Sequence, residues 1–210
     1  LLFVLLSHCC LITFGQTTNN NHSAKSNEIV FNEGIYLTFS EFQKNSPSIK
    51  EFEVKRLGKF GRTINLEYKC FDSISKQITT CIVKNCWAYV SNKTLFISQG
   101  EDDSFFRAQI IGALIHYFAL ETTYEPMHYD YRYGGYYPNT MGTSRRTVSN
   151  EYVIIFETGE QFLFTYRNFA NFLKQNDTEL YQELEKSKRK RKMIYHFLLR
   201  YNEKYPLSIN

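Results

Sequence analysis

The C-terminal stretch, residues 151–206, constrains the fold more than any other part of the chain. Residues 152–156 are an apolar run, a Gly-containing turn follows, and residues 161–164 are apolar again, which predicts a strand, a tight turn and a returning strand. Apolar residues then recur at helical spacing in a short helix after position 165 and in a long helix over 178–205. Because these helices must bury their apolar stripes, the unit predicts helices packed on a sheet.

The ends of these two helices carry recognisable signals. Thr165 is suited to cap the first helix, and Asp177 or Thr178 the second, because their side-chain oxygens accept hydrogen bonds from the first free amides. Pro206 ends the second helix. Glu residues lie early in it and a Lys/Arg cluster lies later, which matches the helix dipole and favours one long helix.

The middle of the chain reads as β structure. Residues 50–98 contain several short stretches in which apolar and polar residues alternate, which is typical of strands. Residues 70–81 look like a hairpin centred on Ser75 and Lys76, which would place Cys70 opposite Cys81. Residues 86–97 form a second predicted hairpin, with Asn92 suited to a positive φ in the turn.

A short N-terminal helix is expected near residue 40. Residues 34–37 read as a strand, and Thr38 with Glu41 forms a T-x-x-E capping box at the start of a helix. The helix must be short because Pro47 pushes Ser46 toward an extended conformation.

Residues 105–121 fit either a helix or strands. Their length and Ala content favour a helix, whereas the isoleucines, the aromatic residues and Gly112 favour strands, and we predict strands with Gly112 at a bulge or bend. The predicted fold class is therefore α+β: a mainly antiparallel β-sheet with a short N-terminal helix and a long C-terminal helix packed on it.

The first fifteen residues indicate export. Residues 1–15 are uncharged, apolar and too short to cross a bilayer, so we expect a signal peptide whose start is truncated, cleaved between Gly15 and Gln16. A lipoprotein acylated at Cys9 or Cys10 is the alternative. Residues 16–27 would be a flexible polar spacer and residues 28–210 a single α+β domain, with no transmembrane span after cleavage. The expected location is the periplasm, the outer-membrane surface or the extracellular space.

Export makes disulfides permissible. Cleavage would leave Cys70, Cys81 and Cys86, an odd number, and the predicted hairpin makes Cys70 and Cys81 the candidate pair. The spacing of these cysteines is not that of a zinc ribbon and the histidines are scattered, so the sequence supports neither a metal site nor another cofactor.

Two surfaces are candidates for binding. Residues 124–150 read as a long Tyr-rich loop that could stack on a glycan through its exposed rings, or be a mobile insertion whose tyrosines pack on the sheet, which we favour. A basic run could bind anionic partners, or be a solvated helix face, which we again favour. The net charge of +4 does not call for nucleic acid. The residues concerned are Tyr129, Tyr131, Tyr133, Tyr136 and Tyr137 in the loop, and Lys188, Arg189 and Lys190 in the basic run.

Signatures of catalysis are weak. His116, Glu121 and His128 come closest to a cluster, but in strands His116 and Glu121 point to opposite faces. The sequence has no G-x-S-x-G, H-E-x-x-H or P-loop motif. We therefore expect an exported cell-envelope or secreted protein with a binding or assembly role, whose partner is a glycan or an envelope protein. A secreted hydrolase with a site built from distant residues is the alternative.

Three passages carry a family resemblance. They are NEGIYLTFSEFQKNSPSI at 32–49, CWAYVSNKTLFIS at 86–98, and the strand-turn-strand of 152–164 together with KYPL at 204–207. Together they resemble a family of exported proteins, widespread in Bacteroidetes, with no assigned activity. Ala88 stands where that family has Gly, and Ser91 and Asn92 depart from its turn. The resemblance implies a location in the cell envelope or outside the cell, and carries over no catalytic residues.

Overall fold

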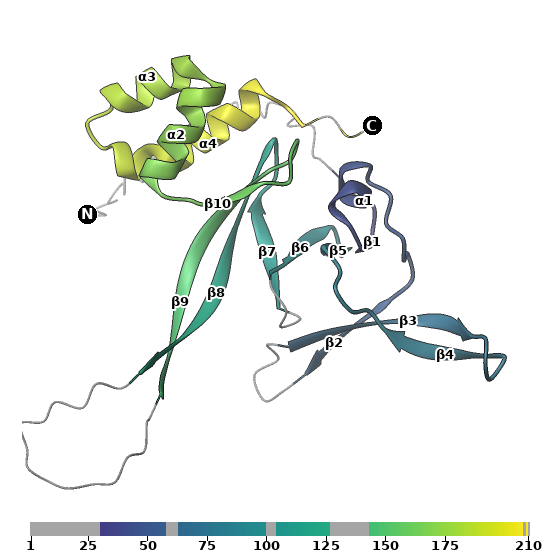
Figure 1. Ribbon diagram of the computed structural model, residues 1–210. Coiled ribbons are helices and arrows are strands. Elements are labelled where there is room, and N and C mark those ends of the chain that lie inside the picture. The colour runs from purple at the N-terminus through teal and green to yellow at the C-terminus, as the bar shows by residue number, and fades with distance from the viewer. Residues whose placement is uncertain (1–29, 58–62, 100–103, 127–142, 208, 210) are drawn as a thin grey trace, which may run out of the picture.

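The computed structural model describes residues 30–57, 63–99, 104–126, 143–207 and 209 (Figure 1). The predicted signal peptide and spacer lie outside these residues. The elements are β1 (Gly34–Tyr36), α1 (Phe39–Gln43), β2 (Glu53–Leu57), β3 (Thr63–Asp72), β4 (Gln77–Ile82), β5 (Ala88–Ser91), β6 (Thr94–Ser98), β7 (Phe105–Ile110), β8 (Leu114–Pro126), β9 (Thr143–Ile155), β10 (Gln161–Leu163), α2 (Tyr166–Asn176), α3 (Thr178–Lys186) and α4 (Lys190–Lys204). The predicted α+β class with mainly antiparallel strands is confirmed.

The strands form two antiparallel sheets. The larger has the order β1-β5-β6-β7-β8-β9-β10, and the smaller has the order β2-β3-β4. In Figure 1 the helices α2, α3 and α4 gather at the β10 end of the larger sheet, and the smaller sheet lies at the end that holds β1 and β5. The strands β8 and β9 pair along their whole lengths and extend past their neighbours as a two-stranded arm.

Side-chain alternation in the larger sheet creates separate cores on its two faces. On one face, Tyr36 and Val90 belong to a core that α1 covers through Phe42. On the other face, the helices cover Leu114 and Val153 of β8 and β9. The smaller sheet contributes Leu66 to a third core, which includes Ile35 and Tyr89, cross-strand neighbours in β1 and β5. The smaller sheet is thus anchored by one of its faces.

The predicted helix caps are present. The Thr38 hydroxyl accepts from the Glu41 amide at 3.2 Å, and the Glu41 carboxylate accepts from the Leu37 amide, one residue before the cap. Thr165 caps α2, and the Asp177 carboxylate caps α3 by accepting from the amide of Leu180 at 3.1 Å. Residues 105–121 are strands as predicted, and Gly112 lies in the bend between β7 and β8.

The predicted long loop over 124–150 is wrong at both of its ends. β8 runs to Pro126 and β9 begins at Thr143, so only residues 127–142 lie between them. The part of β9 before Asn150 is mostly polar, because it belongs to the projecting arm and is not packed between two layers. Its strand character comes from Thr and Val residues that pair with β8 and not from an apolar pattern.

The predicted long C-terminal helix is two helices, which is a second correction. α3 ends at Lys186 and α4 starts at Lys190, and the break allows α4 to run back along α3. Ion pairs fix this arrangement, since Lys204 at the end of α4 lies 2.9 Å from both Asp177 and Glu179 at the start of α3. The like charges of the basic run repel one another within a continuous helix, which favours a break there.

Candidate functional site

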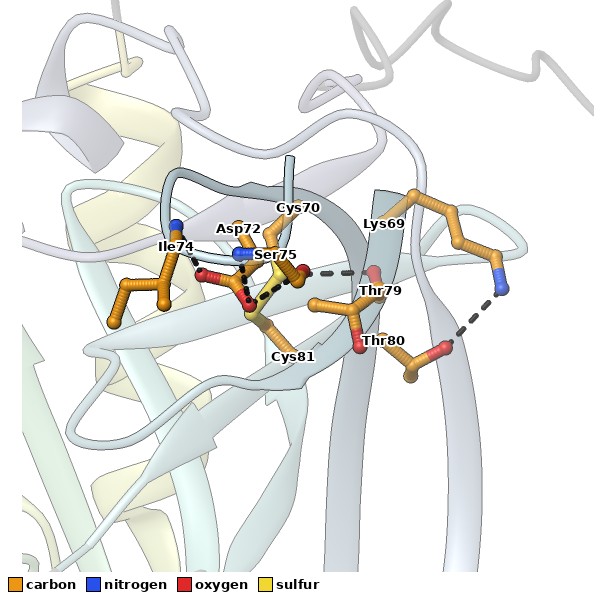
Figure 2. The surroundings of a disulfide bond; sticks show 8 residues. All are labelled: Lys69, Cys70, Asp72, Ile74, Ser75, Thr79, Thr80 and Cys81. Carbon is orange, nitrogen blue, oxygen red and sulfur yellow. Dashed lines mark hydrogen bonds between the residues drawn. A yellow bond between two sulfur atoms is a disulfide. The ribbon is translucent and has the colours of Figure 1, made fainter. Parts of the chain in front are cut away.

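A disulfide closes the hairpin of β3 and β4. The sulfur atoms of Cys70 and Cys81 are bonded, as the sequence predicted, and the two Cα atoms are 5.9 Å apart (Figure 2). The predicted register is wrong, however, because Cys70 faces Thr79 and Cys81 faces Tyr68. The bond therefore joins diagonal neighbours on one face of the hairpin, a separation within the normal range for disulfides.

The turn at the tip of this hairpin is held by Asp72. Its carboxylate accepts hydrogen bonds from the Ser75 hydroxyl at 2.7 Å, the Ile74 amide at 3.0 Å and the Ser75 amide at 3.4 Å (Figure 2). The bonds from Ser75 and Ile74 hold the pKa of Asp72 below its usual range. Lys76 completes the turn with a φ of 55°. The disulfide and these bonds make the tip a fixed structure.

Large apolar side chains are exposed at the tip of this hairpin and on its outer face, which also carries Glu67, Lys69 and Thr80. Phe71 and Ile78 are direct cross-strand partners, and Ile82 lies on the same face because it is four residues from Ile78 in a strand. Ile74 lies in the turn between the two strands. The exposed fractions are 67% for Phe71, 92% for Ile74, 74% for Ile78 and 51% for Ile82. Phe71 and Ile78 are adjacent, and the Lys69–Thr80 pair lies between them and Ile82. Exposed apolar residues gathered on one small element are typical of contact surfaces in soluble proteins.

This apolar surface follows from how the smaller sheet is attached. Leu66 is buried in the third core, and strand alternation places the side chain of Phe71, five residues later, on the opposite face. The inner face supports the sheet, and the outer face is left to solvent. Sequence reasoning identified this hairpin through its cysteines and did not recognise its apolar face, although the spacing of Phe71, Ile78 and Ile82 around a turn was available as a signal.

The predicted basic residues lie together at the break between α3 and α4. Tyr166 and residues 187–192 line a surface depression there. Lys188 and Arg189 are exposed, and Lys190 pairs with Glu185 at 2.5 Å. The predicted match with the helix dipole is reversed, because these cations stand at the start of α4, whose first turn has no side-chain cap and no acidic residue.

The predicted tyrosine site lies outside the described residues. Tyr129, Tyr131, Tyr133, Tyr136 and Tyr137 all fall within 127–142, as does His128. Stacking on a glycan therefore stays a prediction from the sequence.

His116 lies on the helix-covered face and is only 1% exposed. The rings of Phe118, Phe164 and Tyr195 surround it at centroid distances of 5.1–5.2 Å. Its Nε2 atom is 3.3 Å from a carboxylate oxygen of Glu151, which also accepts a hydrogen bond from the Tyr195 hydroxyl. Burial lowers the pKa of His116, and Glu151 opposes that shift. The contacts among His116, Glu151 and Tyr195 fix α4 on β8 and β9. The surrounding rings leave a substrate no approach to the imidazole.

Glu121 points to the other face of β8, as the sequence predicted for strands. Its carboxylate accepts hydrogen bonds from the Tyr152 hydroxyl and from the Asn150 amide, the latter at 2.7 Å. Burial and the hydrogen bond to Glu121 raise the pKa of Tyr152. The predicted trio is thus divided: His116 and Glu121 lie on opposite faces of β8 and have different partners. The sequence could not indicate the actual partners of His116, because Glu151 and Tyr195 come from distant elements.

Comparison with known proteins finds no relative: no family model, no curated protein and no solved structure matches the chain. The proposed membership of an exported Bacteroidetes family therefore depends on the sequence motifs alone. Of the helices in the described part of the chain, none has the length and apolar character needed to cross a bilayer.

Proposed function

We propose that this chain is an exported protein of the cell envelope or extracellular space that works by binding other molecules in an assembly. The observation that carries the proposal is the apolar outer surface of the β3–β4 hairpin, where Phe71, Ile74, Ile78 and Ile82 are each more than half exposed. Burying one such side chain contributes about 1.5–3 kcal/mol, so several on one hairpin provide a substantial driving force for association.

The disulfide supports the location and also the binding role. Stable disulfides form in oxidising compartments and are rare in a reducing cytosol, so the Cys70–Cys81 bond agrees with export. The bond also stiffens the hairpin that carries the apolar surface. A contact surface that is ordered before binding loses less conformational entropy when a partner docks.

A secreted hydrolase has less support. The histidine with a carboxylate partner, His116, is enclosed by Phe118, Phe164 and Tyr195, and its contacts account for it as a packing element. General acid–base catalysis needs a side chain within hydrogen-bond reach of the substrate. Non-catalytic binding through the hairpin needs only the apolar side chains that are exposed on it.

The proposal predicts that assembly depends on Phe71 and Ile78. In size-exclusion chromatography of envelope extract or culture medium from producing cells, a tagged chain should elute as a complex larger than a monomer. In the double variant Phe71→Ser, Ile78→Thr, the ratio of complex to monomer should fall at least tenfold, because the variant removes the cross-strand apolar pair and leaves the fold intact.

The matched control is Leu120→Ser, Leu163→Thr on the larger sheet, where the original side chains are 52% and 40% exposed. It removes the same number of exposed apolar groups and should leave the complex unchanged. A monomer in every sample would contradict the proposal. So would a complex that is insensitive to the hairpin variant or is lost with the control variant.

A further inference from the structure

The strand β4 presents a free sheet edge. The order β2-β3-β4 leaves one side of β4 without a strand, and its sequence, QITTCI, contains no charged residue and no proline. All of its side chains except that of Cys81 are exposed. Natural proteins commonly protect long edges with charges, prolines or coverage, because an unprotected edge pairs with other strands.

The other end strands of the two sheets in the described part of the chain carry such protection, and the arm of β8 and β9, whose outer sides are also unpaired, contains the charged residues Glu121 and Arg146. β2, the opposite edge of the same sheet, has Glu53, Lys55 and Arg56 among its five residues. At the outer side of β1, Ile35 exchanges backbone hydrogen bonds with Ile49. At the other end of the larger sheet, β10 has only three residues. The contrast within one molecule singles out β4.

Backbone geometry shows which residues of β4 offer the free groups. The amide of Val83 donates to the carbonyl of Leu66 at 2.8 Å and continues the β3–β4 ladder. Backbone groups in an antiparallel ladder point alternately toward and away from the partner strand. The amides and carbonyls of Ile78, Thr80 and Ile82 therefore point away from β3, toward the free side.

These three residues make the edge complementary to itself. If a second copy pairs antiparallel about a two-fold axis at Thr80, Ile78 lies opposite Ile82 of the second copy, and Thr80 lies opposite its own equivalent. The residues that face each other are then those with free backbone groups, as hydrogen-bonded pairs require. Ile–Ile and Thr–Thr cross-strand pairs are favourable, and no charges oppose each other along the strand.

We propose that the chain forms a two-fold dimer by pairing its β4 edges, which joins two three-stranded sheets into one sheet of six strands. The inference rests on the proposed function, since it names the partner of the same hairpin. It also extends the exposed Phe71–Ile78 pair of each copy by Ile82 of the other copy, on the same face of the joined sheet. One strand pair buries less than the roughly 800 Å² per partner of a standard interface, so the dimer dissociates in a micromolar range.

The test is sedimentation equilibrium of the purified, oxidised protein across about 1–300 μM, where the wild type should pass from monomer to dimer. Ile82→Lys should weaken the dimer at least tenfold, because it places a charge opposite Ile78 of the second copy. In the monomer the new lysine faces Glu67, its cross-strand neighbour, so folding is not penalised. The matched control is Leu120→Lys, since Leu120 and Ile82 are 52% and 51% exposed.

A second variant addresses the backbone. Thr80→Pro removes an amide that points away from β3, so the hairpin keeps its own ladder while the dimer, in which both copies carry the change, loses two hydrogen bonds. Hydrogen exchange of the wild type gives an independent readout, because the amides of Ile78, Thr80 and Ile82 should become protected only at high concentration.

The outcomes separate the two proposals. A wild type that stays monomeric up to about 300 μM would overturn the dimer. It would also be overturned if the Ile82→Lys and Thr80→Pro variants both dimerise as strongly as the wild type. If the purified protein is monomeric but its complex in cell extracts still depends on Phe71 and Ile78, the dimer is wrong and the binding role stands. If neither association occurs, both proposals fail.

Discussion

Replacing Phe42 with alanine is expected to lower the free energy of unfolding by about 3–5 kcal/mol, the largest loss that we predict for a single substitution. Phe42 is fully buried and lies at the centre of an aromatic cluster. Its ring centroid is 4.4 Å from that of Phe31, 4.6 Å from Trp87, 5.5 Å from Tyr36 and 5.6 Å from Phe156. Alanine would leave a cavity that these rings, which come from different elements, cannot all move to fill.

Urea unfolding followed by tryptophan fluorescence measures this loss, because Trp87 is the single tryptophan of the chain and adjoins Phe42. The midpoint should fall while the slope of free energy against urea stays constant. Phe71→Ala is the matched control, since the same side chain is 67% exposed there and its removal should change stability by about 0.5 kcal/mol or less. Similar losses at the two positions would contradict the assigned core.

Replacing Asn202 with leucine should cost about 2–4 kcal/mol, because it leaves two backbone groups without partners. The Asn202 side chain accepts from the Leu114 amide at 2.8 Å and donates to the Leu114 carbonyl at 2.9 Å. Leu114 is fully buried at the start of β8, so water cannot replace both bonds. The Asn202 side chain thereby makes the two hydrogen bonds with the Leu114 backbone that an adjacent strand would otherwise make, and it fixes α4 on the sheet.

A double-mutant cycle with Gly112 checks this contact. A Cβ atom added at Gly112 would lie 2.4–2.8 Å from three atoms of the Asn202 side chain. Gly112→Ala should therefore be destabilising in the wild type and much less so when Asn202 is already alanine. Additive losses in thermal or urea unfolding would show that the two residues do not meet.

The parts of the fold that could be predicted from the sequence depend on neighbours in the chain. A cap at Thr38, Thr165 or Asp177 involves an amide only three residues away. The turn between β5 and β6 needs two positive φ angles, and Asn92 and Lys93 have φ values of 51° and 58°. Such features are decided locally, so a single sequence contains the information.

The parts that could not be predicted depend on contacts between distant elements. The apolar pattern of 178–205 does not show the break at 187–189, because apolar residues recur at helical spacing on both sides of it, and the like charges of the basic run are the local signal that favours a break. The break is stabilised by α3 packing against α4, which the pattern does not encode. The polar pairing of β8 with β9 is likewise a property of two strands together.

The candidate site shows the same division. Cys70 and Cys81 could be paired from spacing, but the register differed by two residues because the turn covers 73–76 and is organised by Asp72. The outer face of the hairpin could be assigned only after Leu66 was placed in the third core. Sequence alone does not say which of two alternating faces a small sheet buries.

The most direct test of an exported protein with a disulfide-closed hairpin is the state of its cysteines in the producing cells. Cells are quenched in acid, and thiols are labelled with one alkylating reagent before reduction and with a second one after it. Peptide mass spectrometry should find the second label on Cys70 and Cys81, the first on Cys86, and no peptide that retains residues 1–15. The first label on all three cysteines, in a cytosolic chain that keeps its leading segment, would contradict the account.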